Sequence, residues 1–222
     1  MMRIHTKEQA QSVLLDIQGT VLEADLSVPP SPRGLVIFAH GSGSSRFSPR
    51  NRAVAEALNE ASLATLLMDL LTLKEQDTDD ITGHLRFDID LLSARLAGSI
   101  DWARIDPRVK NLRIGLFGAS TGAAAALTAA AQRPNDVAAV VSRGGRPDLA
   151  GASLGEVCCP VLLIVGGYDD IVIELNQRAA ADLKCVNEIA IVPQATHLFE
   201  EPGKLEVVAD LARQWFSRHL AE

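Results

Sequence analysis

Residues 112–131 read LRIGLFGASTGAAAALTAAA, a short apolar run followed by small residues and then by an alanine-rich segment. The apolar run, residues 112–117, has the length and composition of a strand that is covered on both faces. Residues 121–131 are predicted to form a helix. Between the two, Gly118, Ser120 and Gly122 form the pattern G-x-S-x-G. In this context the pattern predicts a sharp turn that leaves the serine hydroxyl exposed above the sheet, with the helix N-terminus behind it.

The chain contains a second copy of the same pattern, which serves as an internal comparison. Residues 151–155 read GASLG, with Ser153 at the centre. No strand precedes this copy and no long helix follows it, so we interpret it as a loop of small residues. The pattern alone is weak evidence, and the strand and helix around Ser120 carry the prediction.

The rest of the chain alternates between short apolar runs and segments with helical spacing. Residues 13–26 alternate in polarity and are predicted to form an edge hairpin. Strands are predicted at residues 35–38, 64–68, 137–141, 161–165 and 188–192, and helices at residues 51–60, 89–102, 173–183 and 205–220. Residues 74–86 are polar and acidic and are predicted to be a solvated loop. Strands that alternate with helices predict an α/β fold with a mostly parallel central sheet and helices on both faces.

Length and composition limit the class of protein. The 222 residues, 47% of them hydrophobic, suit one globular domain over residues 1–222 and exclude a disordered chain. The net charge of −7 disfavours nucleic acid as a partner. Three cysteines, two of them adjacent, predict reduced thiols and no disulfide framework. Because no apolar segment could span or target a membrane, we expect a cytoplasmic protein with no membrane partner, and no metal or other cofactor is implied.

A nucleophilic serine needs a base, and the base needs an acid to orient it. Asp169 follows the predicted strand at residues 161–165, and His197 follows the next predicted strand. Serine, then acid, then histidine is the chain order expected for this kind of turn. Asp170 is the alternative acid, although Asp169 comes first after the strand. The remaining histidines, His5, His40, His84 and His219, are not in equivalent positions.

Acyl transfer also needs hydrogen-bond donors for the developing oxyanion. One is expected to be the backbone amide of Thr121, the residue after the nucleophile. The other is expected to be the amide of Ser42, in a glycine- and serine-rich loop that follows the predicted strand at residues 35–38. We expect His40 to pack beneath this loop in a structural role. The loop lacks the sequence signatures of a phosphate-binding loop, which makes that alternative the weaker one.

These motifs together resemble the α/β-hydrolase superfamily. The resemblance rests on residues 40–43 and 118–122, with Asp169 and His197, and it runs over about residues 35–220. The small size resembles the dienelactone hydrolase-like branch. Residues 142–148 and 197–203 also resemble a bacterial subgroup of uncharacterised hydrolases, and related domains occur joined to phosphoribosyltransferase domains. Dienelactone hydrolases proper use cysteine as nucleophile where this chain has Ser120, so the resemblance implies a serine esterase or a related acyl hydrolase.

The spacing of the predicted strands also bears on the substrate. Fewer than 20 residues separate residue 142 from residue 161, so no large cap domain fits there. The pocket is then open, or it is closed by residues 74–86 or by a homodimer partner. Arg143 and Arg146 follow a strand end on the same side as Ser120 and are candidates to bind a substrate carboxylate or phosphate. The alternative is an ion pair with Asp148 or with the acidic segment.

The sequence therefore predicts a serine hydrolase that cleaves an ester-type bond of a small acyl substrate through an acyl-enzyme. Carboxylesters, lactones and thioesters share one oxyanion geometry and are not distinguished. Two alternatives stay open at this point. The first is an acyltransferase that uses the same triad, and the second is a catalytically silent binding protein with this fold.

Overall fold

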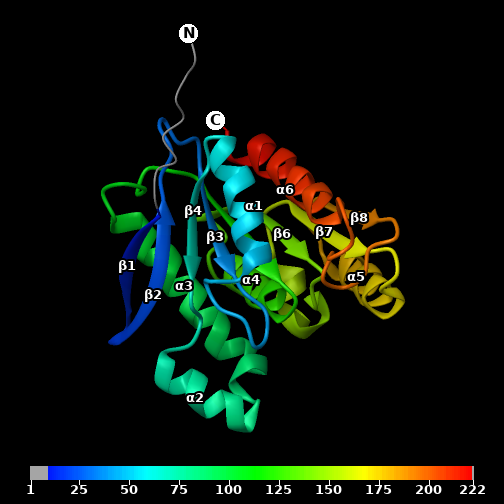
Figure 1. The fold of residues 1–222 in the computed structure, drawn as a ribbon, viewed down its shortest axis with the longest axis horizontal. Helices are drawn as coiled ribbons and strands as arrows, with labels where there is room; N and C mark the ends of the chain where they lie inside the picture. The colour runs from blue at the N-terminus through cyan, green and yellow to red at the C-terminus, as the bar shows by residue number, and fades with distance from the viewer. Residues whose placement is uncertain (1–9, 222) are drawn as a thin grey trace.

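The computed structural model of the protein describes residues 10–221, which build one eight-stranded sheet with helices on both faces (Figure 1). The sheet order is β1-β2-β4-β3-β5-β6-β7-β8. From β4 through β3 to β8 all neighbours are parallel, and β2 is antiparallel to both β1 and β4. The strands are β1 (Gln11–Ile17), β2 (Thr20–Ser27), β3 (Leu35–Ala39), β4 (Ala64–Met68), β5 (Ile114–Ala119), β6 (Val137–Arg143), β7 (Val161–Gly166) and β8 (Asn187–Val192). The predicted mostly parallel sheet is confirmed, and the predicted hairpin over residues 13–26 is β1 and β2 at one edge.

Two groups of helices cover the sheet. Helices α1 (Pro49–Glu60) and α6 (Lys204–Leu220) pack on one face, and α3 (Ile89–Ile105), α4 (Thr121–Gln132) and α5 (Asp170–Asp182) pack on the other (Figure 1). The short 3₁₀-helix η2 (Pro147–Glu156) connects β6 to β7 and contributes to the core beside α4. No inserted cap domain lies between β6 and β7 in this part of the chain.

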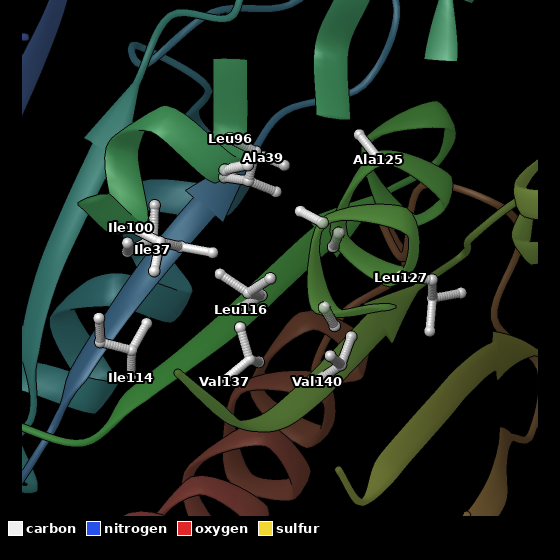
Figure 2. Packing of buried hydrophobic residues seen from close by; sticks show 14 of the residues in the cluster. Ile37, Ala39, Leu96, Ile100, Ile114, Leu116, Ala125, Leu127, Val137 and Val140 are labelled. Atoms are coloured by element: carbon white, nitrogen blue, oxygen red, sulfur yellow. The ribbon is translucent and has the colours of Figure 1, made fainter. Parts of the chain in front are cut away.

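The core is divided into two clusters because successive residues of a strand point to opposite faces. In β3, Ile37 faces α3, and Phe38 faces α1 and α6. In β5, which lies beside β3 in the sheet, Leu116 and Phe117 repeat this pattern. Figure 2 shows the first cluster, in which Ile37 and Leu116 lie with Leu96 and Ile100 of α3. In the second cluster the Phe38 and Phe117 rings lie 4.8 Å apart between centroids. The two clusters bury both faces of the sheet, and the site described below lies at its carboxyl edge.

The prediction of a polar loop at residues 74–86 is wrong, because most of this segment is helical. Helix α2 (Leu73–Thr82) and the 3₁₀-helix η1 (Leu85–Phe87) lie beyond the carboxyl end of β4 (Figure 1). Thr72 and Glu75 form a capping box at the start of α2, with reciprocal backbone hydrogen bonds of 2.8 and 3.2 Å. Gly83, with a φ of 69°, ends the helix in the left-handed conformation. These terminal signals stabilise a helix that the apolar pattern did not indicate.

Candidate active site

Ser120 lies on a strained turn between β5 and α4. Its φ of 51° and ψ of −121° are values that residues other than glycine rarely adopt. The flanking glycines are required by close packing. A Cβ on Gly118 would lie 2.4 Å from the Cα of Ala123, and one on Gly122 would lie 2.3 Å from the carbonyl oxygen of Ala39. The first turn of α4 is thus pressed against β3 and β5, with its positive end behind Ser120.

The second G-x-S-x-G copy has none of this packing. It lies inside η2, and a Cβ on Gly151 would meet nothing within 4 Å. A Cβ on Gly155 would approach only the flexible Lys184 side chain, at 3.5 Å from its Nζ. Ser153 is therefore not on a compact strand–turn–helix connection. This confirms the prediction that no strand precedes and no long helix follows this copy of the pattern.

Asp169 and His197 meet at the carboxyl ends of β7 and β8. The Nδ1 of His197 donates a 2.7 Å hydrogen bond to Oδ2 of Asp169, which leaves Nε2 as the free acceptor of the neutral ring. Backbone hydrogen bonds from Gly167 to Val192 (2.8 Å) and from Tyr168 to Ala195 (2.9 Å) tie the two loops together. The contact is therefore fixed by main-chain pairing as well as by side chains.

The start of α5 decides between the two candidate acids. This helix begins at Asp170, three residues earlier than predicted, and Asp169 is its N-cap residue. Asp170 belongs to the first helical turn, so its side chain leaves in a different direction from that of Asp169. The structure thus brings Asp169, and not its neighbour, to His197.

The loop after β6 connects the serine to this pair. The amide of Ser120 donates to the carbonyl of Arg143 at 3.2 Å, and the amide of Arg146 donates to the carbonyl of Ser120 at 3.1 Å. Between the two arginines, Gly144 adopts a φ of 50°, and a Cβ there would lie 2.9 Å from the carbonyl oxygen of His197. Residues 143–146 therefore pack against both the turn at Ser120 and the loop that carries His197.

The two expected oxyanion donors are also neighbours. The hydroxyls of Ser42 and Thr121 share a hydrogen bond of 3.0 Å, and Thr121 is buried. A Cβ on Gly41 would lie 3.0 Å from the Cβ of Ser120, so the Ser42 loop passes directly over Ser120. Within residues 10–221, neither the Ser42 amide nor the Thr121 amide donates a hydrogen bond to the protein. Both N–H groups are therefore available to a substrate oxygen.

His40 supports this loop from below. It is buried, its Nε2 accepts a hydrogen bond from the Leu70 amide at 3.1 Å, and its Nδ1 donates to the carbonyl of Gly41 at 3.0 Å. Burial lowers the pKa of His40 below its usual value, which favours the neutral ring that these two bonds require. Its position agrees with the structural role expected from the sequence.

The sequence did not point to a second support of the loop, formed by Arg46 and Asp69. The Arg46 amide donates to Oδ1 of Asp69 at 2.7 Å, and the Arg46 guanidinium bonds Oδ2 of Asp69 and the carboxylate of Glu23. Asp69 directly follows β4, so attention to polar residues at every strand end would have singled it out. The pair ties the loop after β3 to the adjacent strand.

The two candidate arginines have different surroundings. Arg146 forms a bidentate ion pair with Asp148, at 2.9 and 2.8 Å, as the alternative interpretation expected. Arg143 is 6% exposed and reaches α1, where its Nη2 donates a 3.4 Å hydrogen bond to Oδ1 of Asn51. Burial and the nearby charge of Arg50 lower the pKa of Arg143 to about 10, so it remains a cation at neutral pH. No carboxylate pairs with Arg143 among residues 10–221.

Residues 10–221 contain no group of three or more His, Cys, Asp or Glu side chains that could hold a metal ion. Over the same residues, no helix is long and apolar enough to cross a membrane.

Comparison with known proteins identifies relatives of this chain by sequence and by fold. The model of the dienelactone hydrolase family matches residues 22–220. A dienelactone hydrolase of Anabaena variabilis ATCC 29413, known from its crystal structure, is 54% identical and has a TM-score of 0.93 over 96% of this chain and 100% of that chain. The esterase domain of a Rhodothermus marinus protein shares the fold, with a TM-score of 0.75 at 20% identity over 96% of this chain and 100% of that chain.

Two curated relatives from Mycobacterium tuberculosis carry a different name. The proteins, from strains CDC 1551 / Oshkosh and ATCC 25618 / H37Rv, are each called "Putative phosphoribosyl transferase". Each is 58% identical over 195 residues, which make up 88% of this chain and 43% of the relative. The chain therefore spans less than half the length of these relatives.

Proposed function

The chain belongs to the dienelactone hydrolase family, and from that premise we propose that it is a serine hydrolase that cleaves an ester-type bond of a small substrate. The observation that carries the proposal is the 2.7 Å hydrogen bond between His197 and Asp169 at the sheet edge where Ser120 occupies its strained turn. Carboxylesters, lactones and thioesters are the bonds considered, because each places one carbonyl oxygen in the same oxyanion position.

In the proposed reaction, Oγ of Ser120 attacks the substrate carbonyl carbon while Nε2 of His197 takes the hydroxyl proton. The amides of Ser42 and Thr121 donate to the oxyanion of the tetrahedral intermediate. That intermediate collapses, the bond to the leaving alcohol or thiol breaks, and His197 returns the proton to the leaving group. Water then attacks the acyl-enzyme with His197 as base, which releases the acid and restores Ser120. Asp169 holds the imidazole in the required tautomer and stabilises its cation.

The name of the Mycobacterium relatives does not alter the proposal. Their matched segment is less than half of each protein, so the activity in the name can reside in the other part. The elements that argue for acyl chemistry, namely the turn at Ser120, the Asp169–His197 pair and the free amides of Ser42 and Thr121, all lie within the segment present here.

Steady-state hydrolysis of p-nitrophenyl esters tests the proposal directly. Ser120→Ala should lower kcat/KM by about 10⁴-fold or more, because triad residues act as a unit. Ser153→Ala, which alters the serine of the second G-x-S-x-G copy, should stay within about twofold of the wild type. A Ser120→Ala protein that retains a tenth of the wild-type rate would refute the assignment. Addition of alcohols, with product analysis, separates hydrolysis from acyl transfer by the same site.

A further inference from the structure

Resting on the proposed function, we propose that Arg86 is a positioning residue that holds the tip of the oxyanion loop from the side of α2. The oxyanion loop is defined here as residues 41–44, which carry the Ser42 amide that is proposed to bind the oxyanion. Asp79 fixes the Arg86 guanidinium, and the guanidinium in turn contacts Gly43. The helical segment after β4 thereby acts on the transition state without touching the substrate.

The tip of the oxyanion loop has few bonds of its own. Its sequence, GSGS, contains two glycines, which leave the backbone more conformational freedom than other residues do. The amide of Ser44 donates to the carbonyl of Gly41 at 3.2 Å, and this bond closes a tight turn in which Gly43 has a φ of 65°. Because His40 and Arg46 hold the chain on either side of the turn, the position of the tip depends on further contacts.

One such contact comes from Arg86. A Cβ on Gly43 would lie 3.5 Å from Nη1 of Arg86, which is ordinary van der Waals contact. Apart from the chain neighbours of Gly43, no other group in the described part of the chain comes within 4 Å of that point. Gly43 and Arg86 also line one cavity together with Ser42 and Thr121, the two residues that supply the oxyanion donors. The guanidinium therefore limits the space into which the tip of the loop can move.

Arg86 is itself held by a buried carboxylate. Its Nε donates to Oδ2 of Asp79 at 2.6 Å, its amide donates to Oδ1 at 3.1 Å, and its Nη2 donates to the Asp79 carbonyl at 2.9 Å. The side chain of Asp79 is 1% exposed and that of Arg86 is 24% exposed. Although burial raises the pKa of Asp79, the hydrogen bonds from Arg86 hold that pKa below its ordinary value, so the pair is charged at neutral pH. These bonds fix the planar guanidinium with Nη1 facing Gly43.

The effect of this contact is expected in the transition state. The Ser42 amide binds an oxygen that becomes charged only after Ser120 attacks the carbonyl carbon. A displaced loop tip therefore costs transition-state stabilisation and leaves substrate binding nearly unchanged. A residue that contacted the substrate directly would instead change KM.

The pair is tested with p-nitrophenyl butyrate and the double variant Asp79→Asn/Arg86→Met, which avoids leaving a buried carboxylate unpaired. This variant should lower kcat by about 10- to 100-fold and keep KM within about threefold. Arg86→Lys keeps a cation beside Asp79 but lacks the fork that reaches Gly43, so it should lower kcat by about 3- to 10-fold and serves if the double variant does not fold. Asp80→Asn removes an exposed partner of the same arginine, at 3.4 Å, and should stay within about twofold of the wild type.

Inhibition by propyl trifluoromethyl ketone gives a readout that a loss of protein stability does not imitate. Ser120 adds to the ketone carbonyl and forms a hemiketal oxyanion, so the Ki should rise in each variant by the factor by which kcat/KM falls. Unchanged kcat and Ki in these variants, or a raised KM with unchanged kcat, overturns the positioning role of Arg86. If hydrolysis still depends on Ser120 in that case, the proposed function stands, whereas hydrolysis that survives Ser120→Ala overturns both.

Discussion

The turn at Ser120 makes one quantitative prediction through Gly122, the last glycine of the G-x-S-x-G pattern. A Cβ at this position would lie 2.3 Å from the carbonyl oxygen of Ala39 and 2.5 Å from that of His40, where ordinary contact begins at 3.4 Å. Both oxygens belong to the main chain at the end of β3, so neither can rotate away. The Gly122→Ala substitution must therefore push the first turn of α4 and the loop after β3 apart by about 1 Å.

Two effects of this displacement have predictable sizes. Overpacking of a rigid core costs about 1–3 kcal/mol, which for a chain of this length lowers Tm by about 2–12 °C. The amides of Ser42 and Thr121 lie on opposite sides of the strained contact, so their separation changes as well. A misplacement of about 1 Å at a catalytic constellation costs about 10²-fold in kcat/KM.

The chain supplies its own control at Gly155, which occupies the same place in the second copy of the pattern. Its Cβ would approach only the mobile end of Lys184, so Gly155→Ala should stay within about 0.5 kcal/mol of the wild type in the free energy of unfolding. Ester hydrolysis and thermal unfolding of both variants decide the question. The packing argument is refuted if Gly122→Ala keeps wild-type kcat/KM and Tm, or if Gly155→Ala loses as much.

Three further predictions concern the orienting acid, a buried histidine and the start of α2. Asp169→Asn should lower kcat by about 10³- to 10⁴-fold with an unchanged Tm, and a loss under tenfold would contradict its orienting role. Burial lowers the pKa of His40 in the folded protein, so below pH 6.5 the unfolded chain binds a proton more readily than the folded chain does. The free energy of unfolding should therefore decrease as the pH is lowered below 6.5, by up to about 1.4 kcal/mol per pH unit. Chemical denaturation of His40→Gln between pH 5 and 7 should show a pH dependence of the unfolding free energy that is smaller by about one proton. An unchanged pH dependence would show that His40 is not its source. Thr72→Ala removes the cap of α2 and should destabilise that helix by about 1 kcal/mol, seen as faster amide exchange in α2, whereas Thr78→Ala within the helix should not.

The parts of the fold that the sequence predicted depend on short-range patterns. The apolar runs that became β3 to β8 are continuous because both faces of the sheet are covered by helices, and this pattern is visible in one chain. The turn at Ser120 was likewise predictable, because Gly118 and Gly122 occur at the spacing that its close packing requires. The chain order of Asp169 and His197 followed from the strand ends.

The features that the sequence did not predict depend on signals outside the apolar pattern or on tertiary contacts. Residues 74–86 have too few apolar residues to indicate a helix, yet the capping box of Thr72 and Glu75 and the stop at Gly83 were present in the sequence. The sequence could not place the Arg143 guanidinium, because its hydrogen-bond partner Asn51 and the nearby charge of Arg50 both come from α1. The alternation of side chains along a strand follows from residue spacing, but the helix that a strand-end side chain meets depends on tertiary packing.

The account rests on Ser120 as an activated nucleophile, and covalent labelling with a fluorophosphonate probe tests that most directly. Peptide mapping by mass spectrometry should find the adduct of the wild-type protein on Ser120, and Ser120→Ala should abolish it while Ser153→Ala leaves it intact. An adduct on Ser153 or another serine, or no adduct on wild-type protein under conditions that label a known serine hydrolase, would contradict the account.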